Sequence, residues 1–242
     1  MNSLTHNNQS NERPDSTGPS LKDLSKVGGI TLLQAAILFT SSGRLDWVMA
    51  WAYLGMYVGY VAILALIVLP KNPGLLAERT QLSKEDAKAW DKPISDILSV
   101  GIFAILLVAG LDMRFGWSLE IPLVIKTTAL AATAMGYLVI GWAMASNKFF
   151  ARSVCIQRGK SHTVATSGPY RFVRHPGYVG TIISSLALSP ALGSLWGLCL
   201  GGPLAVLVVI RTVLEDKTLH NELNGYKEYA QSVRYRLLPG VW

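Results

Sequence analysis

The longest internal polar segment of the chain ends, and its last apolar run begins, within the stretch Gly168-Pro169-Tyr170-Arg171-Phe172-Val173-Arg174-His175-Pro176-Gly177-Tyr178-Val179-Gly180. Turns need glycine and proline, but they do not need arginine, histidine and tyrosine as well. The residues that follow are apolar as far as Ile210. This loop is rigid, rich in cationic and aromatic residues, and next to a membrane segment. These features predict that it is the functional site and that the rest of the chain holds it in place.

The composition is that of a membrane protein. Half of the 242 residues are hydrophobic and 15% are charged, whereas a soluble domain carries about a quarter charged residues. Several apolar runs approach or exceed the roughly 20 residues that a helix needs to cross a bilayer. Cys155, Cys199 and the four scattered histidines have no metal-ligand spacing, so no metal site is expected.

The apolar runs predict an all-α, polytopic membrane protein with about six transmembrane helices, the last two forming a C-terminal hairpin. The six runs cover residues 27–42, 46–69, 94–111, 120–145, 177–190 and 194–214. Beyond them the tail is polar, with apolar residues spaced four and three apart, which is typical of an amphipathic helix. These apolar positions are Leu219, Leu223, Tyr226, Ala230 and Val233.

Three regions follow from this pattern. Residues 1–24 are polar and lack an apolar core, which predicts a disordered tail. Residues 25–145 hold four N-terminal transmembrane helices. Residues 146–242 combine the loop, the helical hairpin and the tail into the functional region.

The charges predict how these helices are oriented. Nineteen of the 22 Lys and Arg residues lie in the two tails and in the connections 71–93 and 146–177. The alternate connections hold Arg44 and Arg114, and Lys126 begins the fourth run. Because basic residues collect on the cytoplasmic side, both termini and the loop are predicted to be cytosolic. The net charge of +7 therefore reflects topology, and no nucleic-acid partner is expected.

Residues before and after the loop extend the candidate site. Glu215 beside a membrane-facing pocket is costly without a cationic partner, which is either Arg211 or a positively charged cofactor. The rings of Tyr170 and Tyr178 can face a cation or an adenine. A phosphate-binding glycine loop, a nucleophile elbow and a zinc-protease motif are all missing from the sequence. The site is therefore predicted to bind and position its ligands.

The functional region resembles the isoprenylcysteine carboxyl methyltransferase family over about residues 145–242. The residues that carry the resemblance are Gly168-Pro169-Tyr170, Arg174-His175-Pro176-x-Tyr178-x-Gly180, Arg211-x-x-x-Glu215-Asp216 and Tyr226-x-x-Tyr229. Asp216 stands where a second Glu is common in that family.

The resemblance implies a methyltransferase that uses S-adenosylmethionine and has Arg211 and His175 as catalytic residues. Arg211 would also face the methyl acceptor. The residues implied to bind the cofactor are Gln157, His162, Thr163, Val164, Ala165, Tyr170, His175, Pro176, Gly177, Tyr178 and Glu215.

The expected reaction is carboxyl O-methylation of a lipophilic acceptor, either a small molecule or a lipid-modified one, that comes from the bilayer to the cytosolic membrane face. In a prokaryote this membrane would be the cell inner membrane. A carboxylate needs no general base, whereas an amine must first lose a proton, for which His175 is the candidate. Phospholipid N-methylation, small-thiol S-methylation, an NADPH-dependent sterol-type reductase and a non-enzymatic scaffold or carrier are the alternatives.

Overall fold

The computed structural model describes residues 21–68, 88–150, 154 and 163–242. Most of the predicted tail, most of the 71–93 connection, Gln157 and His162 lie outside the described residues.

Every described secondary-structure element is a helix or helical turn, as the all-α prediction requires. One helix lies in each of the six predicted apolar runs. The elements are α1 (Leu21–Ser42), α2 (Val48–Ile63) with the π-helical turn η1 (Leu64–Val68), α4 (Asp91–Phe115), α5 (Leu123–Ser146), the 3-10 turn η2 (Gly168–Arg171), α6 (Pro176–Ala191), α7 (Leu198–Glu222) and α8 (Tyr226–Ser232).

Four helical segments of the described chain are long and apolar enough to cross a membrane. They are Val48–Val68, Asp91–Phe115, Leu123–Ser146 and Leu198–Glu222. The apolar part of α1, Gly28–Ser42, and the 16-residue α6 are shorter. Large apolar side chains such as Leu66 and Val124 point outward, with 76% and 74% of their surface exposed. Length, composition and outward apolar surface together support a multi-pass membrane protein.

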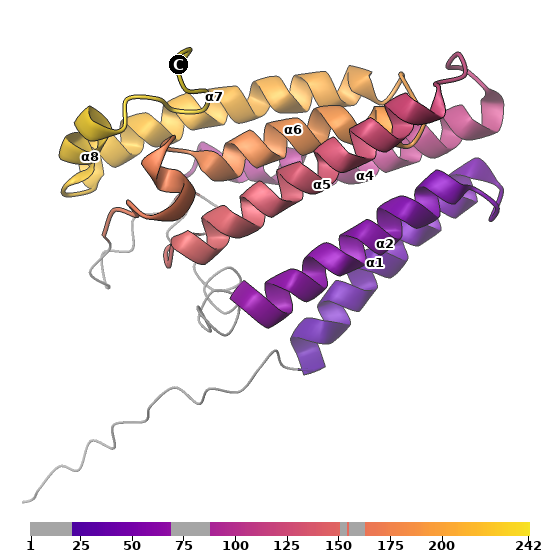
Figure 1. Cartoon of the computed structure of the whole chain (residues 1–242), viewed down its shortest axis with the longest axis horizontal. Coiled ribbons are helices and arrows are strands. Elements are labelled where there is room, and N and C mark those ends of the chain that lie inside the picture. The colour runs from indigo at the N-terminus through magenta and orange to yellow at the C-terminus, as the bar shows by residue number, and fades with distance from the viewer. Residues whose placement is uncertain (1–20, 69–87, 151–153, 155–162) are drawn as a thin grey trace, which may run out of the picture.

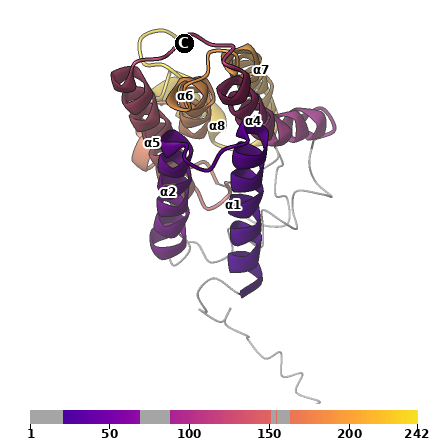
Figure 2. The ribbon, with the colours of Figure 1, turned by 90° about the vertical axis from the view of Figure 1, so that its right-hand side faces the viewer.

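The helices form one elongated bundle (Figure 1). α6 packs most extensively against α5 and also contacts α4 and α7, and the end view in Figure 2 shows it among these helices. The hairpin of α1 and α2 lies along one side, where α1 packs on α4 and α2 on α5.

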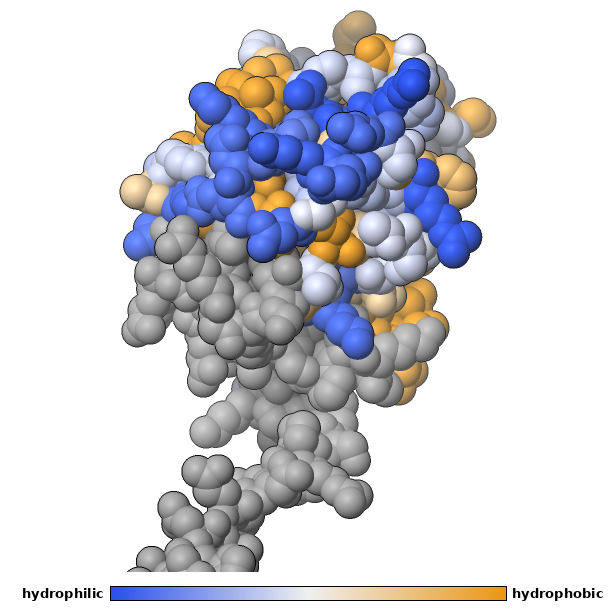
Figure 3. All heavy atoms as spheres, turned by 90° about the vertical axis from the view of Figure 1, so that its left-hand side faces the viewer, coloured by the Kyte–Doolittle hydropathy of each residue, from blue (hydrophilic) through white to orange (hydrophobic). Residues whose placement is uncertain are grey.

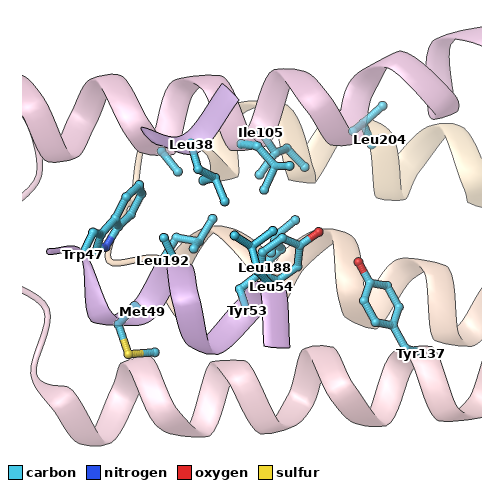
Figure 4. Packing of buried hydrophobic residues seen from close by; sticks show 13 residues of the cluster. Leu38, Trp47, Met49, Tyr53, Leu54, Ile105, Tyr137, Leu188, Leu192 and Leu204 are labelled. Carbon is cyan, nitrogen blue, oxygen red and sulfur yellow. The ribbon is translucent and has the colours of Figure 1, made fainter. Parts of the chain in front are cut away.

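The core is built from apolar side chains of all six long helices and the turn before α2. Figure 4 shows Leu38, Tyr53, Ile105 and Leu188 between the helices, with Leu204 farther along, and each is buried. Trp47 closes the cluster at the turn between α1 and α2. The periodic apolar positions of each run therefore do pack against one another, while the opposite faces remain outward.

Two glycines allow α5 and α6 to approach closely. A Cβ atom on Gly180 would overlap the carbonyl oxygen of Gly136 and lie 2.8 Å from Cγ1 of Ile140. A Cβ atom on Gly136 would in turn lie 2.7 Å from the Gly180 carbonyl oxygen. Gly180 of the motif thus serves backbone packing.

At the end of the bundle away from α8, a buried carboxylate joins two turns. Asp112 accepts a hydrogen bond of 2.7 Å from the amide of Ser118 and further bonds from the hydroxyls of Ser118 and Ser194. These serines lie in the α4–α5 and α6–α7 connections. The boundary predicted between the runs 177–190 and 194–214 is confirmed, because α6 ends at Ala191 and Gly193 has a φ of 84°.

The prediction of one amphipathic helix in the C-terminal tail is wrong. α7 continues to Glu222, Gly225 has a φ of 81°, and the short α8 begins at Tyr226. The apolar periodicity across 219–233 instead marks residues of two helices that bury one shared cluster around Tyr226 and Tyr229.

Gly180→Ala tests the close contact of α5 and α6. The added methyl group should destabilise the fold by about 1–3 kcal/mol, because the backbones cannot separate without loss of packing. The measurement is the thermal unfolding midpoint of the purified protein in detergent. Gly202→Ala is the control, since a Cβ there meets no atom within 4 Å and alanine favours the helix. Equal midpoints for G180A and the wild type would contradict the packing role.

Candidate functional site

The polar parts of the functional region gather at one end of the bundle. The start of α4, the end of α5, the turn η2, the start of α6, the end of α7 and α8 all meet there (Figure 1). Figure 3 looks onto this end and shows hydrophilic side chains gathered on it, with apolar side chains toward the rim. The sequence motifs that are far apart in the chain are therefore brought to one place.

The motif begins with the 3-10 turn η2, which requires glycine at its first residue. Gly168 has a φ of 60°, and a Cβ atom on it would overlap the side chain of Ser146. The turn buries Tyr170, whose hydroxyl accepts a 3.3 Å bond from Asn147 and whose carbonyl oxygen accepts a 2.8 Å bond from the hydroxyl of Tyr229. Burial raises the pKa of Tyr170 well above its ordinary value, so its hydroxyl stays protonated.

The same motif starts α6. His175 precedes the helix and Pro176 occupies its first turn, where a missing N–H costs nothing and the fixed φ suits the helix. A Cβ atom on Gly177 would lie 3.0 Å from the ring of Phe150. His175-Pro176-Gly177 therefore both begins a helix and lets an aromatic ring pack against it.

One buried carboxylate anchors this loop. Asp216 is 2% exposed and lies 3.0 Å from Nε of Arg174, 3.4 Å from Nε2 of His175 and 2.8 Å from Nε of Arg236. The hydroxyl of Tyr226 donates a further bond of 2.9 Å to it. Burial, followed by the adjacent Asp216 carboxylate, raises the pKa of Tyr226 far above its ordinary value, so this hydroxyl remains a donor. A carboxylate out of water needs such partners.

The C-terminal segment is attached to the loop through backbone bonds. The amide of Arg174 donates to the carbonyl oxygen of Tyr235 at 2.9 Å, and that of His175 donates to Arg236 at 3.0 Å. The loop between α5 and α6 is thus held by α7, α8 and the segment that follows α8.

A cavity of about 360 Å³ opens beside the loop, within the range of about 300–1,000 Å³ for small-molecule sites. Nine of the ten described residues that the sequence predicts for the site line it. They are Thr163, Val164, Ala165, Tyr170, His175, Gly177, Tyr178, Arg211 and Glu215. Pro176 is fully buried and supports the loop without lining the cavity.

Of two acidic side chains at this point, Glu215 lines the cavity and Asp91 does not, and the two carboxylates have different partners. The hydroxyl of Tyr178 donates a short hydrogen bond to Glu215. Arg211 binds a different carboxylate, that of Asp91, with its Nε at 2.7 Å and its Nη2 at 2.9 Å. The guanidinium carbon of Arg211 also lies 5.3 Å from the centroid of the Tyr178 ring, in the range of a cation–π contact.

Several residues at the site are not predicted from the sequence. Asp91, Ser95, Leu98 and Ser99 belong to α4, and all but Asp91 line the cavity. Asp91 has the pattern of an ordinary acidic residue at a helix start, which gives no hint of a partner 120 residues away. Asp216 stands in the motif Arg211-x-x-x-Glu215-Asp216, but the sequence does not indicate that it binds Arg174 and His175.

Fold and cavity together define a helical membrane protein with a ligand pocket at the polar end of its bundle. Residues 127–221 match the model of the isoprenylcysteine carboxyl methyltransferase (ICMT) family. Over 72 residues the chain is 36% identical to the Protein-S-isoprenylcysteine O-methyltransferase of Schizosaccharomyces pombe. This match covers 29% of the chain and 30% of that relative, less than a third of its length. The resemblance expected from the motifs is confirmed, and the matched range contains most of the cavity-lining residues.

Asp216→Asn tests the anchor of the loop. Loss of the charge leaves Arg174 and Arg236 without their carboxylate, and breaking a buried pair costs about 3–5 kcal/mol. The expected results are a large fall in the thermal unfolding midpoint and faster proteolysis between residues 163 and 175. Asp46→Asn, at the exposed pair with Arg44, should leave both measurements unchanged. Wild-type stability of D216N would contradict the anchoring role.

Proposed function

We propose that the protein is an S-adenosylmethionine-dependent methyltransferase that forms carboxyl methyl esters on a lipophilic acceptor. The observation that carries the proposal is the convergence of nine predicted site residues, from three separate stretches of sequence, on one cavity. The family match over residues 127–221 supports the same activity.

The cavity has the chemistry that S-adenosylmethionine requires. Glu215, held by Tyr178, offers a carboxylate to the cofactor's ammonium group. The buried Tyr170 and the ring of Phe150 offer aromatic surface to its adenine and sulfonium. Thr163, Val164 and Ala165 add a strip of wall at the aqueous side, and Gln157 and His162 are assigned to the cofactor by the family pattern. The bound cofactor supplies a methyl group that is already activated on a sulfonium.

The protein's own contribution to the reaction is to position the cofactor and the acceptor. Correct placement of two reactants is worth up to about 7–11 kcal/mol of the barrier. Apolar and aromatic side chains such as Leu98, Ile140 and Phe150 form part of the cavity wall, and a less polar surrounding strengthens the attraction between charged groups. Arg211 is assigned to the acceptor's carboxylate, which a guanidinium group binds through charge-assisted hydrogen bonds. His175 is assigned to orientation of the cofactor, and it becomes the proton acceptor only if the methylated group is an amine.

The acceptor is proposed to come from the bilayer. Leu98 of α4 and Ile140 of α5 line the cavity, and both belong to helices that are long and apolar enough to cross a membrane, which supports entry of the acceptor from the bilayer. The excess of Lys and Arg on the connections at this end supports six spans with the pocket and both termini in the cytosol. In a prokaryotic cell the membrane would be the inner membrane. Membrane lipids, and a small or lipid-modified acceptor, are the expected partners.

Glu215→Gln tests the cofactor assignment. Loss of one charge-assisted hydrogen bond, worth about 1.5–3 kcal/mol, should weaken S-adenosylmethionine binding about 10- to 100-fold. Isothermal titration calorimetry in detergent measures the dissociation constant. Glu228→Gln, at an exposed position of α8 outside this cavity, is the control and should bind normally. Binding of NADPH instead of S-adenosylmethionine would favour a reductase, and binding of neither would favour a scaffold.

Arg211→Lys tests the acceptor assignment while keeping the positive charge beside Asp91. Since lysine lacks the bidentate fork, kcat/KM toward an S-prenylated cysteine with a free carboxylate should fall about 10- to 100-fold. The dissociation constant of S-adenosylmethionine should change little. Lys217→Ala removes an exposed cation from the same helix and should retain full activity. Unchanged catalytic efficiency of R211K would remove Arg211 from this role.

A further inference from the structure

Asp91 stands at the centre of a set of contacts that the proposed function does not use. It is the first residue of α4, and none of its surface is exposed. Besides the two bonds from Arg211, its carboxylate accepts a 2.7 Å bond from the amide of Val154 and a 3.1 Å bond from the hydroxyl of Ser95. It therefore joins α4, α7 and the connection between α5 and α6 at one point beside the cavity.

The position of Asp91 matters because Arg211 has a second carboxylate one helical turn away. Residues four apart on a helix are neighbours, and opposite charges at this spacing attract. Glu215 is therefore a natural alternative partner for Arg211. The two carboxylates are kept in separate contacts: Asp91 binds the Nε–Nη2 edge of Arg211, and Glu215 binds the hydroxyl of Tyr178. The guanidinium carbon of Arg211 lies 5.3 Å from the centroid of the Tyr178 ring, so Tyr178 contacts both Arg211 and Glu215.

Removal of Asp91 would change which groups bind Arg211 and Glu215. Arg211 is only 7% exposed, and a buried cation left without its carboxylate is strongly unfavourable. A turn of its side chain toward Glu215 would restore an ion pair. Glu215 would then be neutralised within the protein, and an incoming ammonium group would have to compete with Arg211 for it.

We propose that Asp91 is a positioning residue that holds Arg211 on α4 and so keeps the Glu215 carboxylate available to a cationic ligand. The ligand class is a primary ammonium, such as that of S-adenosylmethionine, and in this respect the inference rests on the proposed function. Asp91 lies outside the residues 127–221 that match the family. The N-terminal helices thereby contribute to binding through a residue that does not touch the ligand.

The test compares Asp91→Asn, Asp91→Asn with Arg211→Met, and the control Asp96→Asn, which changes an exposed acid on the same helix. In D91N the dissociation constant of S-adenosylmethionine should rise about tenfold or more, the value of one charge-assisted bond. In the double variant the competing cation is gone, so the affinity should return toward that of the wild type. D96N should bind like the wild type. If D91N does not fold, Asp91→Glu replaces it. The dissociation constant of S-adenosylmethionine should then also rise, by a smaller factor.

Two further readouts separate positioning from a purely structural role. Calorimetric stoichiometry reports the folded fraction, whereas the dissociation constant reports the site itself. Labelling of Glu215 by a carbodiimide and an amine, read by mass spectrometry without any cofactor, reports whether its carboxylate is engaged by Arg211. Labelling should fall in D91N and recover in the double variant.

A fall in stoichiometry with unchanged affinity and unchanged Glu215 labelling would overturn the inference and leave Asp91 as a structural residue. Failure of Arg211→Met to restore affinity and labelling in D91N would overturn it as well. If the wild type binds no S-adenosylmethionine, the proposed function fails. The labelling of Glu215 then decides the inference on Asp91 alone.

Discussion

The polar end of the bundle depends on burying the carboxylate of Asp216 among cationic and hydroxyl groups. Two guanidinium groups, an imidazole and a phenol surround it at distances of 2.8–3.4 Å. A charge removed from water is stable only with such partners, so α7, α8, the 168–175 loop and the segment after α8 are held in one arrangement. The cavity exists because this arrangement holds the loop beside α7.

Asp91, beside the cavity, and Glu215, which lines it, also need partners, but each has a different one. Asp91 binds Arg211, Glu215 is one helical turn away from Arg211 on α7, and Tyr178 contacts both Arg211 and Glu215. The carboxylate of Asp91 is bound by Arg211, whereas that of Glu215 accepts a hydrogen bond from the hydroxyl of Tyr178. This asymmetry suits a site that must attract a cation to one wall and an anion to the other. In the proposed function these are the cofactor's ammonium and the acceptor's carboxylate.

The sequence predicts the helices well because each apolar run must be buried or face lipid. It misses the true end of α7, since Arg211, Glu215 and Asp216 resemble the polar residues that follow a span. Their charges are satisfied by buried partners, so the helix continues to Glu222. Within the site, the motif around His175 can be recognised from the sequence because its residues are adjacent in the chain. The role of Asp91 cannot be recognised in this way, because a single acidic residue at a helix start does not indicate a partner 120 residues away.

The central claim is that this pocket transfers a methyl group to a carboxylate. The most direct measurement uses S-adenosylmethionine labelled in its methyl group, the purified protein in lipid vesicles, and an S-prenylated cysteine with a free carboxylate. The account predicts label in the prenylated product that mild alkali releases as methanol, and none when the carboxylate is blocked as an amide. Label that resists alkali, or no transfer by a folded protein that binds the cofactor, would contradict it.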